Sequence, residues 1–97
     1  MNNFELSGKA KSDLIKIALY TQLTWGMAQR NDYLKVLDTT FQLLADEPEL
    51  GISCDNIREG YNKYPQASHV LYYKKIKINQ ILIIRILHKS MDVNSAL

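Results

Sequence analysis

Cysteine, histidine and glycine are scarce in this chain, and each shortage excludes a class of protein. A single cysteine, Cys54, excludes a disulfide framework and agrees with a reducing compartment. The histidines are His69 and His88, and with Cys54 they have no metal-ligand spacing, so we expect no metal. The few glycines form no phosphate-binding loop, and no other cofactor motif is present, so we expect no cofactor.

Long apolar runs are also missing. The longest one is interrupted at Arg85, far short of the length that spans a bilayer. The first residues, MNNFELSGKAK, lack the basic-then-apolar pattern of a secretion signal. We therefore expect a cytoplasmic protein that makes no contact with a membrane.

Charge is nearly balanced over the whole chain but not along it. The formal net charge is +2. Residues 1–50 hold five Lys or Arg and seven Asp or Glu, whereas residues 51–97 hold seven and three. This asymmetry is typical of an interaction face for an acidic partner, and a solvated sheet edge explains it equally well.

The first half of the chain has the pattern of a helical hairpin. Its 97 residues suit a single domain, 1–97. NNFELS alternates as a short strand, and Ser7 is a candidate cap for a helix that ends at Gly26. A second helix is predicted over 28–46, before Pro48. In the first helix an additional apolar stripe, Ile15, Leu19 and Leu23, is either buried or awaits a partner.

The second half is rich in tyrosine and β-branched residues and predicts three strands. They are IREGYNKYP, SHVLYYKKI and QILIIRILH, which begin at residues 57, 68 and 80. The element order is thus β-α-α-β-β-β, with helices and strands segregated. This order predicts an α+β fold in which a helical hairpin packs on an antiparallel sheet.

The last strand is apolar on both faces. Strict alternation directs Leu82, Ile84 and Ile86 to one face, which we expect the helices to cover. The opposite face holds Ile81, Ile83, Arg85 and Leu87. An apolar patch rimmed by charge usually marks a protein interface, so the sequence predicts a partner on this second face. Arg85 would anchor a carboxylate of that partner.

Catalysis finds little support in the residues. No serine or cysteine stands in a nucleophile motif. Cleavage of RNA would need an acid, a base and cations, and the strand half offers a possible set. That set is Arg58, Lys63, Tyr64, His69, Tyr73, Arg85 and His88. Cross-strand packing explains the tyrosines equally well.

Three stretches together resemble a known family. RNDYLKVLDTTFQLLADEPELG, DNIREGYNKYPQASHVLYYK and IIRILHKSMD are similar in order and spacing to segments of the ParE toxins, and LSGKAKSDLIKIALYTQLTWG fits their first helix. The resemblance covers nearly the whole chain and looks closest to the Vibrio members. It implies the ParE/RelE fold, which agrees with the order reached above.

The resemblance also implies a function. ParE toxins belong to type II toxin–antitoxin systems, stabilise the cleaved-DNA complex of DNA gyrase, and are neutralised by a ParD-type antitoxin. A chain of this kind would meet DNA only through gyrase or the antitoxin, and would form a homodimer or a toxin–antitoxin hetero-oligomer. It would be no enzyme. Relatives of the RelE type instead cut mRNA on the ribosome, which is the alternative function.

Two sets of residues follow from this resemblance and from the patterns above. The candidates for contact with gyrase are Arg58, Arg85, His88, Lys89 and Met91. The candidates for binding the antitoxin are Leu14, Ala18, Leu19, Trp25, Ile81, Ile83 and Leu87. Core packing explains the helical members of the second set equally well.

Three positions depart from the family pattern. Ile52 and Lys74 stand where many members have arginine, and Ser95 stands where many have histidine. Lysine does not form the bidentate contacts that arginine forms. The three departures therefore bear on how strongly a chain of this kind would inhibit gyrase. A harmless member that only binds the antitoxin is a third possibility.

Overall fold

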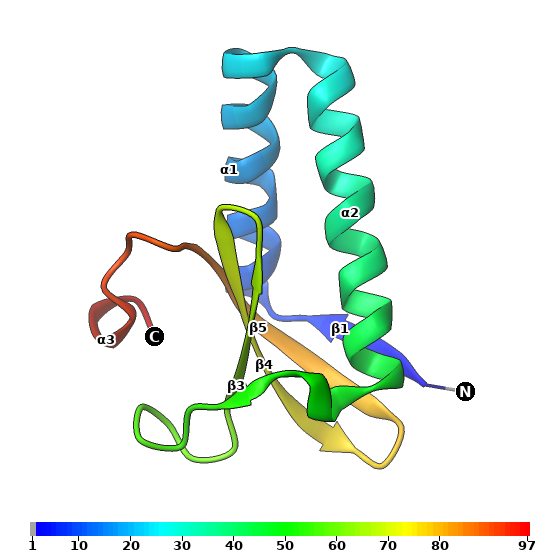
Figure 1. Cartoon of the computed structure of the whole chain (residues 1–97), viewed down its shortest axis with the longest axis vertical. Coiled ribbons are helices and arrows are strands. Elements are labelled where there is room, and N and C mark those ends of the chain that lie inside the picture. Colours follow the sequence, from blue (N-terminus) through cyan, green and yellow to red (C-terminus); the bar gives the residue numbers. More distant parts are fainter. Residues whose placement is uncertain (1) are drawn as a thin grey trace.

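The computed structural model describes residues 2–97. Its elements are β1 (Asn3–Leu6), α1 (Gly8–Trp25), α2 (Met27–Asp46), the 3-10 helix η1 (Pro48–Leu50), β2 (Ile52–Ser53), β3 (Asn62–Gln66), β4 (His69–Lys77), β5 (Gln80–His88) and α3 (Val93–Ala96). The strands form a sheet in the order β1-β5-β4-β3-β2. Helices α1 and α2 lie side by side, pack on this sheet and project beyond it (Figure 1). The predicted α+β fold with a helical hairpin is confirmed.

Local chemistry sets the limits of α1. The Ser7 hydroxyl accepts a hydrogen bond from the Ala10 N–H at 3.0 Å, which satisfies one of the free donors of the first turn. Gly26 ends the helix at φ 94°, a region that favours glycine, and its N–H donates to the Gln22 carbonyl at 2.9 Å. The predicted cap and the predicted break are both confirmed.

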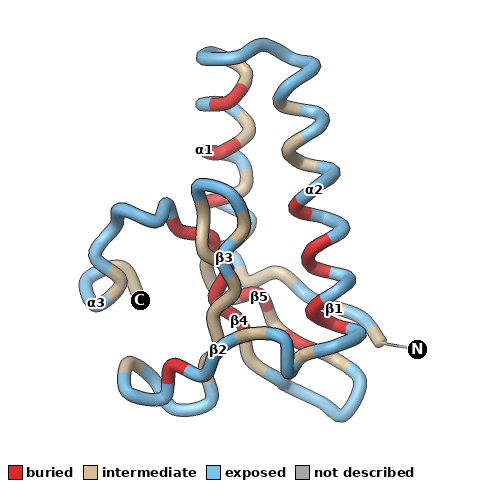
Figure 2. The backbone as a smooth tube through the Cα atoms, viewed as in Figure 1, coloured by how far each residue is buried: buried red, intermediate tan, exposed pale blue. Residues whose placement is uncertain are grey.

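The main core lies between the lower half of the hairpin and the sheet. Helix α1 contributes Ala10 and Ile17, and α2 contributes Leu37, Phe41 and Leu44, all of them buried. Their partners on the sheet are Leu71, Tyr73, Ile81, Ile83 and Ile86. Figure 2 shows that burial concentrates at this end, while the far half of the hairpin is mostly exposed. The far half therefore offers surface to a partner.

The sheet is mixed rather than wholly antiparallel. The meander β3-β4-β5 is antiparallel, as predicted. Strand β1 runs parallel to β5, with Phe4 opposite Ile81 and Leu6 opposite Ile83. The helical hairpin supplies the long crossover that a parallel pair requires, and this long-range pairing leaves no local mark in the sequence.

Strand β3 begins later than predicted, at Asn62 rather than at residue 57. The carboxylate of Asp55 accepts the Gly60 N–H at 2.8 Å, and Gly60 has φ 82°. Together they hold residues 55–60 in a turn.

An irregularity in β5 reverses the predicted faces of Ile81 and Ile83, and it leaves Ile86 and Leu87 on the faces predicted for them. Tyr72 pairs with Arg85, but the next residue, Tyr73, pairs with Ile83, so Ile84 is an extra residue on β5. Such a bulge shifts the alternation by one position. As a result, Ile81 and Ile83 join Ile86 on the side of the helices. The prediction that Ile81 and Ile83 face a partner is therefore wrong.

Tyr73 connects the sheet to the loop after α2. Its hydroxyl donates to the Pro48 carbonyl at 2.6 Å and accepts the Gly51 N–H at 2.9 Å. A β-carbon on Gly51 would lie 2.1 Å from that hydroxyl oxygen, so only glycine fits. Burial raises the pKa of Tyr73, which keeps the hydroxyl protonated.

Candidate interaction surfaces

Arg85 is satisfied within its own chain. Its Nε and Nη2 donate to the two carboxylate oxygens of Asp13 in α1, at 2.8 and 2.9 Å. Its Nη1 donates to the Ala96 carbonyl at 2.6 Å, and the Ile86 N–H also donates to Asp13, at 3.0 Å. The hydrogen bonds to Asp13 raise the pKa of Arg85. The prediction that Arg85 anchors a carboxylate of a partner is wrong, because Asp13 supplies that carboxylate.

The second face of the sheet is covered by the chain itself. Cys54, Tyr72 and Leu87 form a buried cluster there. The turn after β2 covers it with Ile57 and Tyr61, and the C-terminal segment covers it with Val93, Ala96 and Leu97. Leu87 is thus 2% exposed, although it was predicted to face a partner. We call this group the second cluster and residues 93–97 the C-terminal segment.

Cations gather beside the C-terminal segment. A cavity of about 240 Å³ is lined by Lys9, Arg58 and Arg85 together with Tyr61, Ile84, Ala96 and Leu97. Arg58 is exposed, and its Nη2 donates to the main-chain oxygen of Leu97 at 2.7 Å. Two of the predicted target-contact residues, Arg58 and Arg85, therefore meet here.

The remaining target-contact candidates follow β5 elsewhere. His88, Lys89 and Met91 are exposed, and Met91 retains 56% of its accessible surface. The Lys89 N–H donates to the Ser68 carbonyl at 2.9 Å, which fixes the start of the tail against the β3-β4 turn. The tail is accessible for contact with a target.

His88 lies against His69, at the start of β4. The two rings are 5.6 Å apart and edge to face, and Nδ1 of His69 lies 2.7 Å from the hydroxyl of Tyr33 in α2. Burial lowers the pKa of His69, and so does the neighbouring His88. Both histidines line a cavity of about 380 Å³ beneath the hairpin, together with Tyr20, Thr21, Trp25, Gln29, Tyr33, Ala67 and Ser68.

The residues considered for RNA cleavage do not lie together at one site. The two histidines line one cavity, Arg58 and Arg85 line another, and Tyr73 is buried in the main core. Within the described part of the chain, the cavity with the histidines has no lysine or arginine in its lining. A phosphate held there would lack the cations that stabilise its charge.

The outward face of α1 carries a row of exposed apolar side chains. Ile15, Leu19 and Leu23 are 69%, 56% and 78% exposed, at a spacing of four residues that aligns them on one side of the helix. Trp25 and Met27 extend this apolar surface at the tip of the hairpin. We call Ile15, Leu19 and Leu23 the α1 stripe. Of the two interpretations of the additional apolar stripe, the structure contradicts the one in which it is buried within the chain.

The helical candidates for antitoxin binding divide between the core and the surface. Leu14 packs against the main core and Ala18 is half-buried, whereas Leu19 and Trp25 are exposed. Sequence reasoning placed Ile15 and Leu23 in the correct stripe but did not include them among the candidates.

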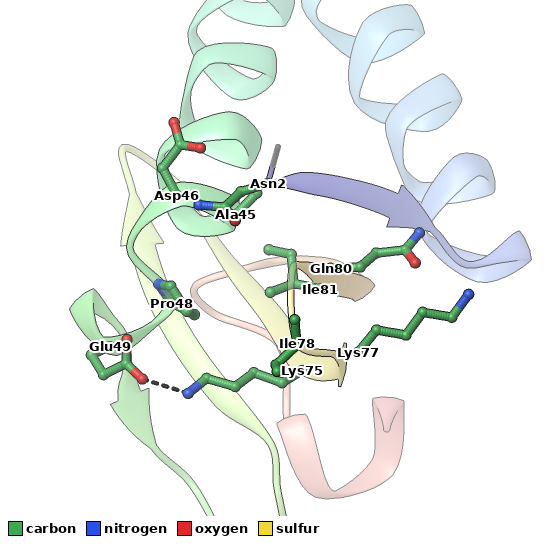
Figure 3. Close-up of a pocket in the computed structure, with 10 residues that line it drawn as sticks. All are labelled: Asn2, Ala45, Asp46, Pro48, Glu49, Lys75, Lys77, Ile78, Gln80 and Ile81. Carbon is green, nitrogen blue, oxygen red and sulfur yellow. Dashed lines mark hydrogen bonds and ion pairs between the residues drawn. The ribbon is translucent and has the colours of Figure 1, made fainter.

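The opposite end of the molecule holds a third cavity, of about 230 Å³ (Figure 3). It lies between the end of α2, η1 and the β4-β5 turn, and Glu49 forms an ion pair with Lys75 at its edge. The hydrogen bond with Lys75 lowers the pKa of Glu49. The charges of Glu49 and Lys75 neutralise each other. Within residues 2–97, which the structure describes, none of the predicted target-contact residues lines this cavity.

The positions that depart from the family pattern have ordinary roles. Ile52 is exposed in β2. The ammonium of Lys74 lies 5.8 Å from the centre of the Tyr61 ring, so this position keeps a cation over an aromatic ring. The Ser95 hydroxyl donates to the carboxylate of Asp92 at 3.0 Å. Ser95 belongs to the cap of α3.

The fold and these surfaces define a small α+β protein that presents an exposed apolar face on α1 and a group of cations beside the C-terminal segment. Residues 4–93 match the family described as ParE toxin of type II toxin–antitoxin system, parDE. Toxin ParE1 of Caulobacter vibrioides is 36% identical over 97 residues, which span 100% of this chain and 99% of that one. Toxin ParE1 of Mycobacterium tuberculosis is 36% identical over 93 residues, 96% of this chain and 95% of that one.

The chain therefore belongs to the ParE toxin family of type II toxin–antitoxin systems. A solved structure, described as the chromosomal ParDE TA system from P. aeruginosa, superposes with a TM-score of 0.75 at 17% identity. The alignment covers 91% of this chain and 96% of the other, so the two share a fold. These comparisons confirm the family predicted from sequence, and the expected likeness to Vibrio members stays a prediction. Among residues 2–97, neither long helix has the length and hydropathy needed to cross a bilayer.

Proposed function

We propose that this chain inhibits DNA gyrase by stabilising its cleaved-DNA complex, and that a ParD-type antitoxin neutralises it. Membership of the ParE family supports both parts. The chain would act by binding rather than by catalysis, and it would meet DNA only through gyrase or the antitoxin.

The observation that carries the antitoxin half of the proposal is the α1 stripe. Three large apolar side chains more than half exposed on one helical face are costly in water, and such a face normally meets a partner. Its spacing suits a helix of the antitoxin laid along α1, in the manner of helix-in-groove recognition. Leu19 would lie at its centre, with Trp25 at one end.

The charges of α1 specify the chemistry of that antitoxin helix. Lys9, Lys11 and Lys16 are exposed on α1, whereas its one acidic residue, Asp13, is buried against Arg85. A partner with an apolar stripe and flanking acidic residues would complement this face. The complex would then be a toxin–antitoxin hetero-oligomer.

The gyrase contact is assigned to the tail that follows β5. His88, Lys89 and Met91 offer an exposed imidazole, an ammonium and a flexible thioether next to one another. Arg58 belongs to the same basic half but lies with the C-terminal segment. Arg85 contributes indirectly, since its donors are bound within the chain.

Cleavage of mRNA on the ribosome is the second candidate. The close pair of His69 and His88 favours it, because an acid and a base are what phosphodiester cleavage needs. Arg58 and Arg85, the arginines of the proposed catalytic set, lie at another cavity, which weighs against it.

A gyrase cleavage assay tests the proposal. The purified chain is mixed with gyrase, ATP and supercoiled plasmid, and the denatured DNA is separated on a gel. We expect linear DNA that disappears when the cognate antitoxin is added. Lys89→Glu should reduce the linear product, and Lys77→Glu, at another exposed lysine, is the matched control.

The opposite results are equally specific. Intact supercoiling together with cleaved transcripts in a translating extract would establish the RelE-type activity instead. A chain that binds antitoxin but leaves both gyrase and transcripts unaffected would be a harmless member of the family.

A further inference from the structure

Most of the side chains that line the cavity beneath the hairpin carry rings. They are Tyr20, Trp25, Tyr33, His69 and His88, and they include both histidines and the single tryptophan of the chain. The rings come from α1, α2, β4 and β5, so elements far apart in the sequence bring them together. The volume of about 380 Å³ lies within the range of small-molecule sites, about 300–1,000 Å³. Rings gathered around such a space favour a planar ligand. We call this space the aromatic cavity.

The aromatic cavity combines accessible rings with fixed ones. Tyr20 and Trp25 are 67% and 70% exposed, and His88 is exposed as well. Tyr33 and His69 are half-buried, and the hydrogen bond between them holds both rings. The β3-β4 turn stands beside α1 in Figure 1, which brings the start of β4 next to the hairpin. A ligand could therefore reach the accessible rings without unfolding any element.

Polar groups at the aromatic cavity suit the edge of a nucleobase. The Ser90 N–H donates to Nδ1 of His88 at 3.2 Å, so the proton of the neutral ring lies on Nε2, which can donate to a ligand. Gln29 and Ser68 are exposed and add an amide and a hydroxyl that can donate or accept. Nucleobases carry donors and acceptors at their edges and offer a ring face for stacking.

The charges fit a base whose phosphates stay outside. Among residues 2–97 the lining includes no carboxylate that would repel an anionic strand. It includes no lysine or arginine either, so a phosphate would find no cationic partner inside. Lys89 is exposed and directly follows His88, which supplies a cation for the backbone of a strand just outside the lining.

We propose that the aromatic cavity binds an unpaired base of the DNA strand that gyrase has cleaved. The inference rests on the gyrase target proposed above. A base beside a strand break has lost a stacking neighbour, so it leaves the stack at a lower cost than a base inside a duplex. His88, a candidate for the gyrase contact, lines the cavity. The chain would still reach DNA only where gyrase presents such a base.

The first test measures base binding by the free chain. Trp25 is the single tryptophan, so its indole N–H gives one isolated NMR signal at the cavity. A single-stranded DNA of about six nucleotides should shift this signal until it saturates, whereas a longer duplex that contains the same sequence should not. Absence of a shift would overturn the inference. Thymidine monophosphate bound as tightly as the oligonucleotide would identify a free nucleotide as the ligand, and would overturn the strand.

Variants of α1 separate stacking from folding. Tyr20→Ala should weaken oligonucleotide binding at least about fivefold, which is the lower limit for the loss of one stack between a base and a ring. Tyr20→Phe keeps the ring and should bind as the unmodified chain does. Leu23→Ala alters another exposed apolar residue of α1, outside the lining, and is the matched control. Unchanged binding by Tyr20→Ala, or an equal loss in Tyr20→Phe, would overturn stacking in the cavity.

The second test uses the complex with gyrase. The cleavage assay is repeated with DNA that carries iododeoxyuridine in place of thymidine, because ultraviolet light joins this base to an aromatic side chain in contact with it. We expect a crosslinked peptide that contains Tyr20 or Trp25. Tyr20→Ala should also yield less linear DNA than Leu23→Ala, which should match the unmodified chain.

The outcomes separate the two proposals. Linear DNA without a crosslink to Tyr20 or Trp25 overturns the base site and leaves gyrase inhibition in place. Absence of linear DNA from both the unmodified chain and Leu23→Ala overturns the gyrase target, and the cleaved strand as the ligand with it. Tighter binding of RNA than of DNA of the same sequence would assign the cavity to a transcript, and would overturn the DNA strand.

Discussion

Removing one member of the pair formed by Asp13 and Arg85 should strongly destabilise this fold, because the other charge would be left buried without a partner. Asp13 is 7% exposed and accepts three hydrogen bonds, two from the guanidinium and one from the Ile86 N–H. The side chain of Arg85 is 18% exposed. Replacing Asp13 by alanine would leave a mostly buried guanidinium without its anion. Breaking such a pair from one side costs about 3–5 kcal/mol.

We place the expected loss for Asp13→Ala near the lower limit, at about 3 kcal/mol, because water still reaches part of Arg85. For a domain of this size, that loss corresponds to a fall in melting temperature of about 12 °C or more. Urea unfolding followed by far-UV circular dichroism measures the free energy directly. Asp32→Ala, at an exposed position of α2, is the control and should change it by less than about 0.5 kcal/mol.

A loss below about 1 kcal/mol would refute this reasoning, because that is the range of solvent-exposed ion pairs. The combined change of Asp13→Leu and Arg85→Met offers a second check. It replaces both charges by apolar groups of similar size, so it should recover more than half of the loss. Failure to recover would mean that the pair specifies the bulged strand rather than neutralising a buried charge.

Two further predictions concern stability. Gly51→Ala should lower the free energy of unfolding by about 2 kcal/mol or more, because its methyl group would displace the Tyr73 hydroxyl, whereas Gly8→Ala has open space and should be tolerated; urea unfolding compares the two variants. Burial lowers the pKa of His69, so the folded state prefers the neutral imidazole. The unfolded chain therefore takes up a proton more readily, and the free energy of unfolding is highest above pH 6.5 and falls as the pH decreases. Melting temperatures measured from pH 7.5 to 5 should therefore fall more for the unmodified chain than for His69→Gln, and equal slopes would contradict this assignment.

Regular features of the fold could be predicted from the sequence because their causes are local. Ser7 and Gly26 set the limits of α1 through hydrogen bonds and φ angles that depend on neighbouring residues alone. The three strands of the meander likewise follow from composition and turn residues. Each of these signals lies within a few residues of the element that it specifies.

The faces of β5 could not be predicted, because alternation assumes a regular strand. One extra residue, Ile84, moves Ile83 and Ile86 to the same side, and nothing in the composition of the strand marks it. The bulge depends on long-range contacts, including the bond from the Ser7 hydroxyl to the Ile84 carbonyl at 2.7 Å. The cover formed by α3 was missed for a related reason, since four residues carry no periodic signal.

The α1 stripe gives the sharpest functional prediction, because it can be altered without touching the core. Leu19→Glu introduces a charge at an exposed position, so the free energy of unfolding should change by less than about 0.5 kcal/mol. The same change buries a carboxylate against the proposed antitoxin helix and should weaken binding by about 2–4 kcal/mol. Gyrase inhibition should persist, so cells producing Leu19→Glu would no longer be rescued by the antitoxin. Ile78→Glu, at a 96% exposed site on the β4-β5 turn, is the matched control and should leave rescue intact. Normal antitoxin affinity for Leu19→Glu would show that the stripe meets something other than the antitoxin.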